Sequence, residues 1–251
     1  MMTGTHSNAL ERMNRFEAAE GKATADLIRP KDAATLILVD RSERVPKVLL
    51  GKRHARHKFM PGMFVFPGGR VDPADRTMPV ARALHHDVET QLLKRLARPS
   101  SAKARSFALA AIRETFEETG LLLGVRTNNI NGVPPGPWTA FAQAGILPDL
   151  GLLHFIGRAI TPPRRPRRFD ARFFAMDASA ITHRVEGMTG PDAELVELVW
   201  MPLAQAQRLH LPAVTSVMLE ELDARIALGF GHKLPVPFYR MPRKQFMREM
   251  L

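Results

Sequence analysis

The segment from Ala102 to Leu122 restricts the possible folds of this chain more than any other stretch. Its apolar residues recur every three or four positions, which predicts a helix that ends at Gly120 or Gly124. The apolar side chains on one face are Leu109, Ile112 and Phe116. The helix therefore has one face for a core, and the chemistry of the opposite face needs its own explanation.

Three glutamates crowd that opposite face within an arc of roughly 100°: Glu114, Glu117 and Glu118. Like charges one turn apart repel by roughly 0.2–0.5 kcal/mol per pair, and Arg113 can offset only part of this by pairing with Glu117. Clustered carboxylates beside a main-chain carbonyl would suit Mg²⁺ or Mn²⁺, which favour oxygen ligands. The alternative is a solvated acidic face with no ligand.

A glycine turn is the natural neighbour of the acidic face. Residues 63–70 predict a strand that runs into Pro67-Gly68-Gly69, and glycines permit close approach of another element. One turn upstream of the glutamates, Ala110 and Ala111 leave room for that backbone. We therefore expect the glycines to pack on the helix beside the acids.

The remaining pattern mixes strands and helices. Strands are expected over 33–39, 47–53, 152–160, 172–176 and 195–201, and helices over 80–97, 203–209 and 213–228. The polar link between the first two strands indicates a hairpin. This alternation predicts an α/β fold, a mixed sheet packed between helices.

One domain over 29–251 is expected, with a flexible leader at 1–28 and a C-terminal helical extension. The basic stretch at about 76–105 has the composition of an insertion. It could form a helical cap over a cleft, a homodimer contact or a plain surface excursion.

Composition narrows the location and the partners. The chain lacks cysteine, has no run of 18 apolar residues and shows no secretory signal, so the cytoplasm is the expected location and no membrane partner is expected. The net charge of +11 favours anionic partners. Nucleic acid is the less favoured partner, because base stacking needs exposed aromatic side chains and the chain has one tyrosine and two tryptophans.

The acidic helix and the glycine turn together resemble the Nudix box, G-x5-E-x7-R-E-U-x-E-E-x-G-U, where U is a bulky apolar residue. Gly69 matches the first glycine, and the second half is matched by Arg113, Glu114, Glu117, Glu118, Gly120 and Leu121. Asp75 replaces the first glutamate, Thr115 stands at the first U, and 37 residues separate Asp75 from Arg113 where the usual box has seven. This interruption is similar to the Nudix branch that includes a peroxisomal coenzyme A diphosphatase, and the likeness extends over about residues 29–210.

The resemblance implies an α/β/α sandwich and Mg²⁺- or Mn²⁺-dependent hydrolysis of a small-molecule nucleoside diphosphate derivative. Glu118 and Glu114 would be the leading metal ligands, and Glu117 would share the metal or its water. The Gly68 carbonyl would add an oxygen ligand. Arg113 would orient the glutamates, and Asp75 would be a weaker, water-mediated participant.

Further candidates surround this motif. Arg53 could clamp a phosphate, and Gly69 would face the substrate. Glu186 or Glu194 could supply an extra ligand or base, since the family often takes one from that region. The candidate phosphate contacts are His54, His57, His183 and the arginine run 164–168.

The substrate stays open among coenzyme A or acyl-coenzyme A, ADP-ribose and NAD(H), because Met60 stands where the coenzyme A-specific pattern has a histidine. A Nudix-like module that senses a nucleotide or binds RNA without hydrolysis is the alternative, and a damaged enzyme is a third possibility.

Overall fold

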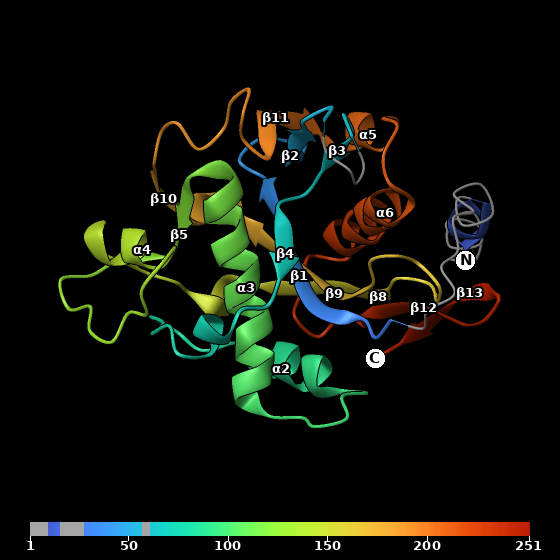
Figure 1. Ribbon diagram of the computed structural model, residues 1–251, viewed down its shortest axis with the longest axis horizontal. Coiled ribbons are helices and arrows are strands. Elements are labelled where there is room, and N and C mark those ends of the chain that lie inside the picture. Colours follow the sequence, from blue (N-terminus) through green and yellow to red (C-terminus); the bar gives the residue numbers. More distant parts are fainter. Residues whose placement is uncertain (1–9, 16–27, 57–60) are drawn as a thin grey trace.

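A mixed sheet forms the centre of the computed structural model, which describes residues 10–15, 28–56 and 61–251 (Figure 1). The order along the sheet is β11-β2-β1-β9-β8-β12-β13, with short β3 paired to β2 and short β4 paired to β1. The strands span Lys31–Asp40 (β1), Lys47–Arg53 (β2), Phe64–Val65 (β3), Gly68–Arg70 (β4), His154–Ile160 (β8), Phe169–Asp177 (β9), Leu195–Pro202 (β11), Pro237–Arg243 (β12) and Gln245–Met250 (β13). β1 and β9 run parallel, whereas β1 and β2 form the expected antiparallel hairpin.

Helices cover both faces of the sheet: His86–Leu93 (α2), Ser101–Thr119 (α3), Thr139–Gln143 (α4), Leu203–Ala206 (α5) and Ala213–Ala227 (α6). Smaller elements are the 3₁₀ turns Pro73–Arg76 (η1), Leu150–Leu152 (η2) and Ala178–Ala180 (η3), and the strands Leu121–Leu123 (β5), Val125–Arg126 (β6), Ile146–Leu147 (β7) and Ile181–Arg184 (β10). Two small sheets, β10-β5 and β6-β7, stand beside the main one.

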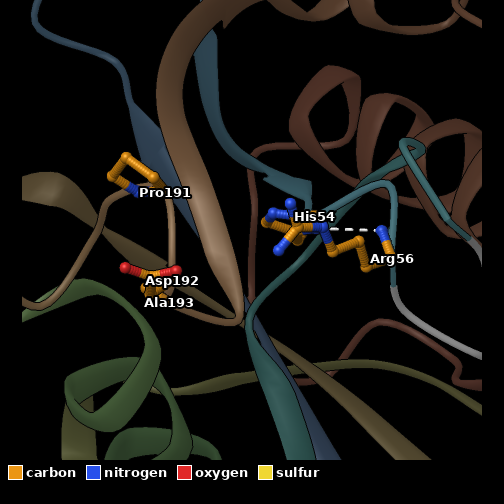
Figure 2. Close-up of a pocket in the computed structure, with 5 residues that line it drawn as sticks. All are labelled: His54, Arg56, Pro191, Asp192 and Ala193. Atoms are coloured by element: carbon orange, nitrogen blue, oxygen red, sulfur yellow. Dashed lines mark hydrogen bonds between the residues drawn. The ribbon is translucent and has the colours of Figure 1, made fainter.

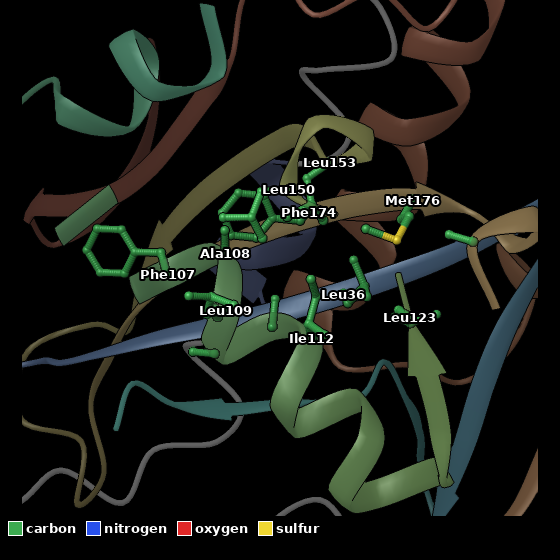
Figure 3. Packing of buried hydrophobic residues seen from close by; sticks show 14 of the residues in the cluster. Leu36, Phe107, Ala108, Leu109, Ile112, Leu123, Leu150, Leu153, Phe174 and Met176 are labelled. Atoms are coloured by element: carbon green, nitrogen blue, oxygen red, sulfur yellow. The ribbon is translucent and has the colours of Figure 1, made fainter. Parts of the chain in front are cut away.

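The central strand β1 divides the core into two layers. Leu36 and Leu38 join the cluster under α3, part of which Figure 3 shows, whereas Ile37 and Val39 join the cluster under α6. Successive side chains of a strand point to opposite faces, so an uninterrupted apolar run such as this is buried on both sides. The predicted α/β/α sandwich around a mixed sheet is therefore confirmed.

Helix α3 begins and ends at recognisable caps. The Ser100 side chain accepts the Lys103 N–H at the first turn, and Gly120 follows the last turn with φ of 74°. A side chain at Gly120 would collide with the Val185 carbonyl, so only glycine fits there. Gly120 is thus the stop, and Leu121–Leu123, expected partly as helix, pairs with β10 instead.

The predicted strand over 63–70 is two strands. Phe64 and Val65 pair with β2, whereas Gly68–Arg70 pairs with β1, and the Pro67 carbonyl between them accepts the Leu36 N–H. The chain changes partners here because β1 and β2 pair directly only at their hairpin end, over Val39↔Val48 and Asp40↔Lys47. This step places the two glycines on the central strand.

The insertion is mostly irregular and carries one short helix. The helical pattern over 80–97 is helical only at α2, and α3 begins inside the expected insertion, at Ser101. The insertion is held to the domain by the Arg82–Asp149 ion pair, 2.6 Å between Nη2 and Oδ2, and by the Gln91 amide, which donates to the Leu234 carbonyl. It packs beside the lower half of α3 in Figure 1.

The two ends of the described chain meet on the α6 face. The expected C-terminal helices are present as α5 and α6. The proline-interrupted tail after them forms β12, which pairs in parallel with β8, and β13, which pairs antiparallel with β12. Residues 10–15 of the expected leader are helical, with Met13 buried in the α6 cluster and the Asn14 side chain accepting the Phe246 N–H. Every helix in the described ranges is too short or too polar to cross a bilayer.

Candidate active site

The acidic face of α3 lies directly against the glycines of β4. A Cβ atom added to Gly69 would stand 2.5 Å from the Glu114 carboxylate carbon. A side chain at Gly69 would displace the Glu114 carboxylate, so the glycine turn approaches the acidic helix closely, as expected. The approach fixes where Glu114 can point.

Arg113 ties the acidic face together. Its Nη1 donates to Glu114 Oε1 at 2.9 Å and to Glu117 Oε1 at 3.0 Å, and its Nη2 donates to the Arg70 carbonyl at 2.7 Å. Burial opposes the guanidinium charge, but the surrounding carboxylates, Asp75 first, outweigh it and raise the Arg113 pKa. Arg113 therefore stays charged and holds two of the three glutamates in place.

Asp75 does not face solvent or the acids, contrary to the expected water-mediated role. Its side chain is fully buried and accepts from Arg113 Nε at 2.8 Å and Nη2 at 3.1 Å. It also accepts the Asp72 N–H at the start of η1. The shorter aspartate thus serves as the anchor of Arg113, and this pair joins the two halves of the interrupted motif.

Glu118 is the most buried of the three acids, with a side chain 7 % exposed. Burial, followed by repulsion from Glu194 and Glu114, raises its pKa well above the ordinary value, although Arg53 and the Gly68 N–H act in the opposite direction. Its Oε2 is buried and has no hydrogen-bond partner among the described residues. A buried carboxylate oxygen without a partner is costly unless a ligand supplies one.

Burial also raises the Glu114 pKa, to about 7, and Arg113 only partly counters it. Burial therefore opposes the charged forms of two neighbouring carboxylates. A cation between them would remove this penalty, because it supplies the missing positive charge.

Gly68 offers a main-chain oxygen to the same space. The bond from the Leu36 N–H to the Pro67 carbonyl and the register Thr35↔Gly68 make Gly68 a non-hydrogen-bonded position of the β1–β4 ladder. Its N–H and C=O therefore point away from β1, and its N–H interacts with Glu118. The Gly68 carbonyl is directed to the same side.

Arg53 and Glu194 close the other side of the site. They come from the end of β2 and the residue before β11, and Arg53 Nη2 lies 2.9 Å from Glu194 Oε1. The charges of both residues act on Glu118. The sequence offers two acidic candidates in this region, Glu186 and Glu194, and Glu194 is the one that reaches the acidic face.

A pocket of about 250 Å³ opens beside this ion pair (Figure 2). His54 and Arg56 form one wall, with His54 Nδ1 accepting the Arg56 N–H at 2.8 Å, and Pro191, Asp192 and Ala193 form the other. The sequence pattern indicated His54 but not Arg56 or Asp192. No local signal marks these two residues, because two loops distant in sequence bring them together.

Other sequence candidates lie elsewhere. Glu186 is 78 % exposed beside Arg184, and His183 is exposed on β10. The arginine run 164–168 forms the turn between β8 and β9, where Arg168 donates to the Thr161 and Ile28 carbonyls. His57 and Met60 fall outside the described residues.

The donor set fits a hard divalent cation. In the described ranges, no three histidine or acidic side chains already form a metal cluster. The site instead combines glutamates of one helix with a main-chain carbonyl, and the partnerless Glu118 oxygen marks its centre. Carboxylates, a carbonyl and room for water are what Mg²⁺ and Mn²⁺ favour.

Comparisons with known proteins agree with this geometry. Residues 30–140 match the family model described as the NUDT19 Nudix domain. A Caenorhabditis elegans protein named as a nudix hydrolase is 29% identical over 62% of this chain and 46% of its own length. The human acyl-coenzyme A diphosphatase NUDT19 is 29% identical over 51% of this chain and 47% of its own length. The chain thus spans about half the length of these curated relatives.

Among solved structures, the crystal structure of a Nudix hydrolase from Alicyclobacillus acidocaldarius superposes with a TM-score of 0.57 at 29% identity. The match covers 81% of this chain and 97% of that one. These matches agree with the interrupted Nudix box, whose two halves are joined by the Arg113–Asp75 pair. Residues 30–140 thus match a Nudix domain, and the chain shares the Nudix fold with a hydrolase of known structure.

Proposed function

We propose that this protein hydrolyses the diphosphate linkage of a nucleoside diphosphate derivative with the help of Mg²⁺ or Mn²⁺. The observation that carries the proposal is the buried Glu118 oxygen without a partner among the described residues, surrounded by Glu114 and the Gly68 strand position. A domain that only bound a nucleotide would have no need of three clustered glutamates. The family name and the relatives support the same reaction class.

The residues divide into ligands and supports. Glu114, Glu118 and the Gly68 carbonyl would hold the metal, and Glu117 would share it or a water beside it. When bound, the cation would offset the negative charge of the diphosphate and make water easier to deprotonate. Arg113, fixed by Asp75, keeps Glu114 and Glu117 oriented.

Proton removal from the attacking water falls to a carboxylate. Glu114 is one candidate, and Glu194 is the other because it reaches the acidic face from a different loop. Such positioned base catalysis contributes about 10²–10⁴-fold. Arg53 donates to Glu194 and lies where a phosphate oxygen could replace that partner, which suits phosphate binding.

Within this range we favour coenzyme A and its esters as the substrate class, because the human relative is named an acyl-coenzyme A diphosphatase. ADP-ribose and NAD(H) are the other members of the proposed range. The positive charge of Arg56 beside the site suits a substrate with several phosphates. A nucleotide-sensing module without hydrolysis is the competing function.

The test is a substrate panel read by product mass. The purified chain is incubated with coenzyme A, an acyl-coenzyme A, ADP-ribose or NADH, with Mg²⁺ or Mn²⁺. Glu118→Gln keeps the shape of the side chain and removes the charge, so we expect turnover to fall by about 10²-fold or more. Glu186→Gln, at an exposed glutamate away from the site, is the matched control and should leave turnover unchanged.

The outcomes separate the possibilities. Undiminished turnover in Glu118→Gln would refute the assignment of the site. Absence of product from every compound and both metals, with a folded protein, would refute hydrolysis. Calorimetric binding of the same compounds would then favour the sensing module.

A further inference from the structure

A column of three stacked imidazole rings, continued by one tilted phenyl ring, joins the insertion to the domain. His85 caps the start of α2, His232 lies between α6 and β12, and His154 is the first residue of β8. The ring centroids of His85 and His232 are 4.3 Å apart and those of His232 and His154 are 4.2 Å apart, with planes inclined by 14° and 5°. Phe230 continues the column at 4.0 Å from His154.

Cations surround this column on the domain side. The Arg41 guanidinium lies 4.5 Å from the Phe230 centroid. Arg225, buried on α6, donates to the Gly231 and Leu234 carbonyls and so fixes the loop that carries His232. The facing acid is Asp87 on α2, whose Oδ2 is 3.5 Å from His85 Nδ1. Two arginines therefore oppose further positive charge in the column, and one aspartate favours it.

The two inner imidazoles lack a hydrogen-bond acceptor for the N–H that a second proton would create. The Nδ1 atoms of His154 and His232 are buried and have no hydrogen-bond partner among the described residues. A neutral imidazole can leave one nitrogen as a bare lone pair, whereas an imidazolium must donate from both nitrogens. Protonation would create a buried charged donor without an acceptor, which is more costly than an unused lone pair.

The electrostatics agree with this geometry. Burial, followed by the charge of His232 and of Arg225, lowers the pKa of His154 to about 3. Burial, followed by the charge of His85, also lowers the pKa of His232, although Asp87 acts in the opposite direction. Both shifts favour the neutral imidazoles.

We propose that this column is an acid-sensitive latch, which holds the insertion against β8 and the loop after α6 only while its imidazoles are neutral. The other contacts of the insertion, such as the Arg82–Asp149 pair and the Gln91 amide, use no histidine. The latch is independent of the proposed hydrolysis. The insertion lies between Asp75 and α3 in the chain. Protonation of the column would therefore loosen the segment that interrupts the Nudix motif.

The sign follows from proton linkage. The insertion contributes His85 to the groups that lower the His154 pKa, so a neutral His154 favours the docked state and a protonated His154 favours release. The stabilisation of the docked state is therefore complete above about pH 6.5 and declines as the pH falls below it.

Hydrogen exchange measured by mass spectrometry on the full chain tests the latch. Protection factors, corrected for the intrinsic effect of pH, are compared between pH 7.5 and 5.0 for peptides within 79–98 and for control peptides from α6 and β9. We expect protection of the insertion to fall at least tenfold more than protection of α6 and β9. The double variant His154→Phe/His232→Phe keeps the rings without titratable nitrogens and should lose less than threefold.

His86→Phe is the matched control, because His86 is an exposed neighbour of His85 and is not one of the rings of the column. It should respond to acid as the parent does. If the double variant does not fold, His232→Phe alone should still reduce the acid response by threefold or more. Equal protection of the parent at both pH values, or an equal acid response in the phenylalanine variants, would overturn the latch.

Discussion

Replacing Gly69 with alanine would place a methyl group on the Glu114 carboxylate. The added Cβ would stand 2.5 Å from the carboxylate carbon and from Oε2, and 2.6 Å from Oε1. Non-bonded carbon atoms prefer about 3.5–4.0 Å, so the carboxylate would have to retreat by about 1 Å. The displaced group is the end of a flexible side chain, and the Gly69 backbone is not in the left-handed region, so the fold can absorb the change.

We expect Gly69→Ala to lower the catalytic activity much more than the stability. A displacement of about 1 Å at a catalytic group can cost about 10²-fold in rate. Loss of the Arg113–Glu114 hydrogen bond would cost about 1 kcal/mol or more, and the reduced freedom of the unfolded chain would return about 0.4–1 kcal/mol. We therefore expect Gly69→Ala to lower kcat/KM by about 10²-fold while the melting temperature moves by about 4 °C or less.

Gly68→Ala should instead lower the stability of the fold. Its Cβ would stand 2.7 Å from the Ala34 carbonyl oxygen and from Thr35 Cα, which are backbone atoms of the central strand and cannot retreat alone. Overpacking of this kind costs about 1–3 kcal/mol, so the melting temperature should fall by about 4–10 °C. Turnover of Gly69→Ala within threefold of the parent, together with unchanged Mn²⁺ binding by calorimetry, would refute the placement of Glu114 in the site.

Two further predictions concern buried polar contacts that stabilise the fold. Asp75→Asn leaves the buried Arg113 without its main partner, so we expect a loss of about 3–5 kcal/mol of unfolding free energy in a urea titration. The exposed cap variant Asp72→Asn should lose less than about 1 kcal/mol, and equal losses in the two variants would contradict the anchoring role of Asp75. Tyr239, the single tyrosine, donates to the buried Glu221, and burial followed by that carboxylate raises its pKa well above about 10. Because the unfolded chain releases this proton near pH 10, stability should decline above that pH. The phenolate absorbance at 295 nm should rise together with unfolding measured by circular dichroism, and phenolate formation in a fully folded protein would contradict the burial.

The local pattern predicted the parts of the site that lie on one element. The acidic and apolar faces of α3, the stop at Gly120 and the approach of the glycines follow from helical spacing and from the size of side chains. The hairpin of β1 and β2 follows from two apolar runs joined by a short polar link. These features depend on residues close in sequence, and the pattern of a few positions is enough to predict them.

Features formed by segments distant in sequence could not be predicted from the local residue pattern. The tail after α6 became strands because β8 offers a free edge to Phe238 and Tyr239, and no composition signal reveals that edge. Arg53 reaches Glu194 because β11 pairs beside β2 in antiparallel register. The histidine column likewise requires the insertion, β8 and the loop after α6 to meet.

The sequence by itself determined a helix with a carboxylate face, glycines small enough to touch it and apolar strands buried on both sides. Only the tertiary structure decided that Asp75 bonds to Arg113 across 38 positions, and that it anchors the arginine instead of facing a metal. The physical reason is that side-chain spacing fixes which face of an element is polar, whereas the partner of a buried charge depends on which segments the packed core brings within hydrogen-bond distance.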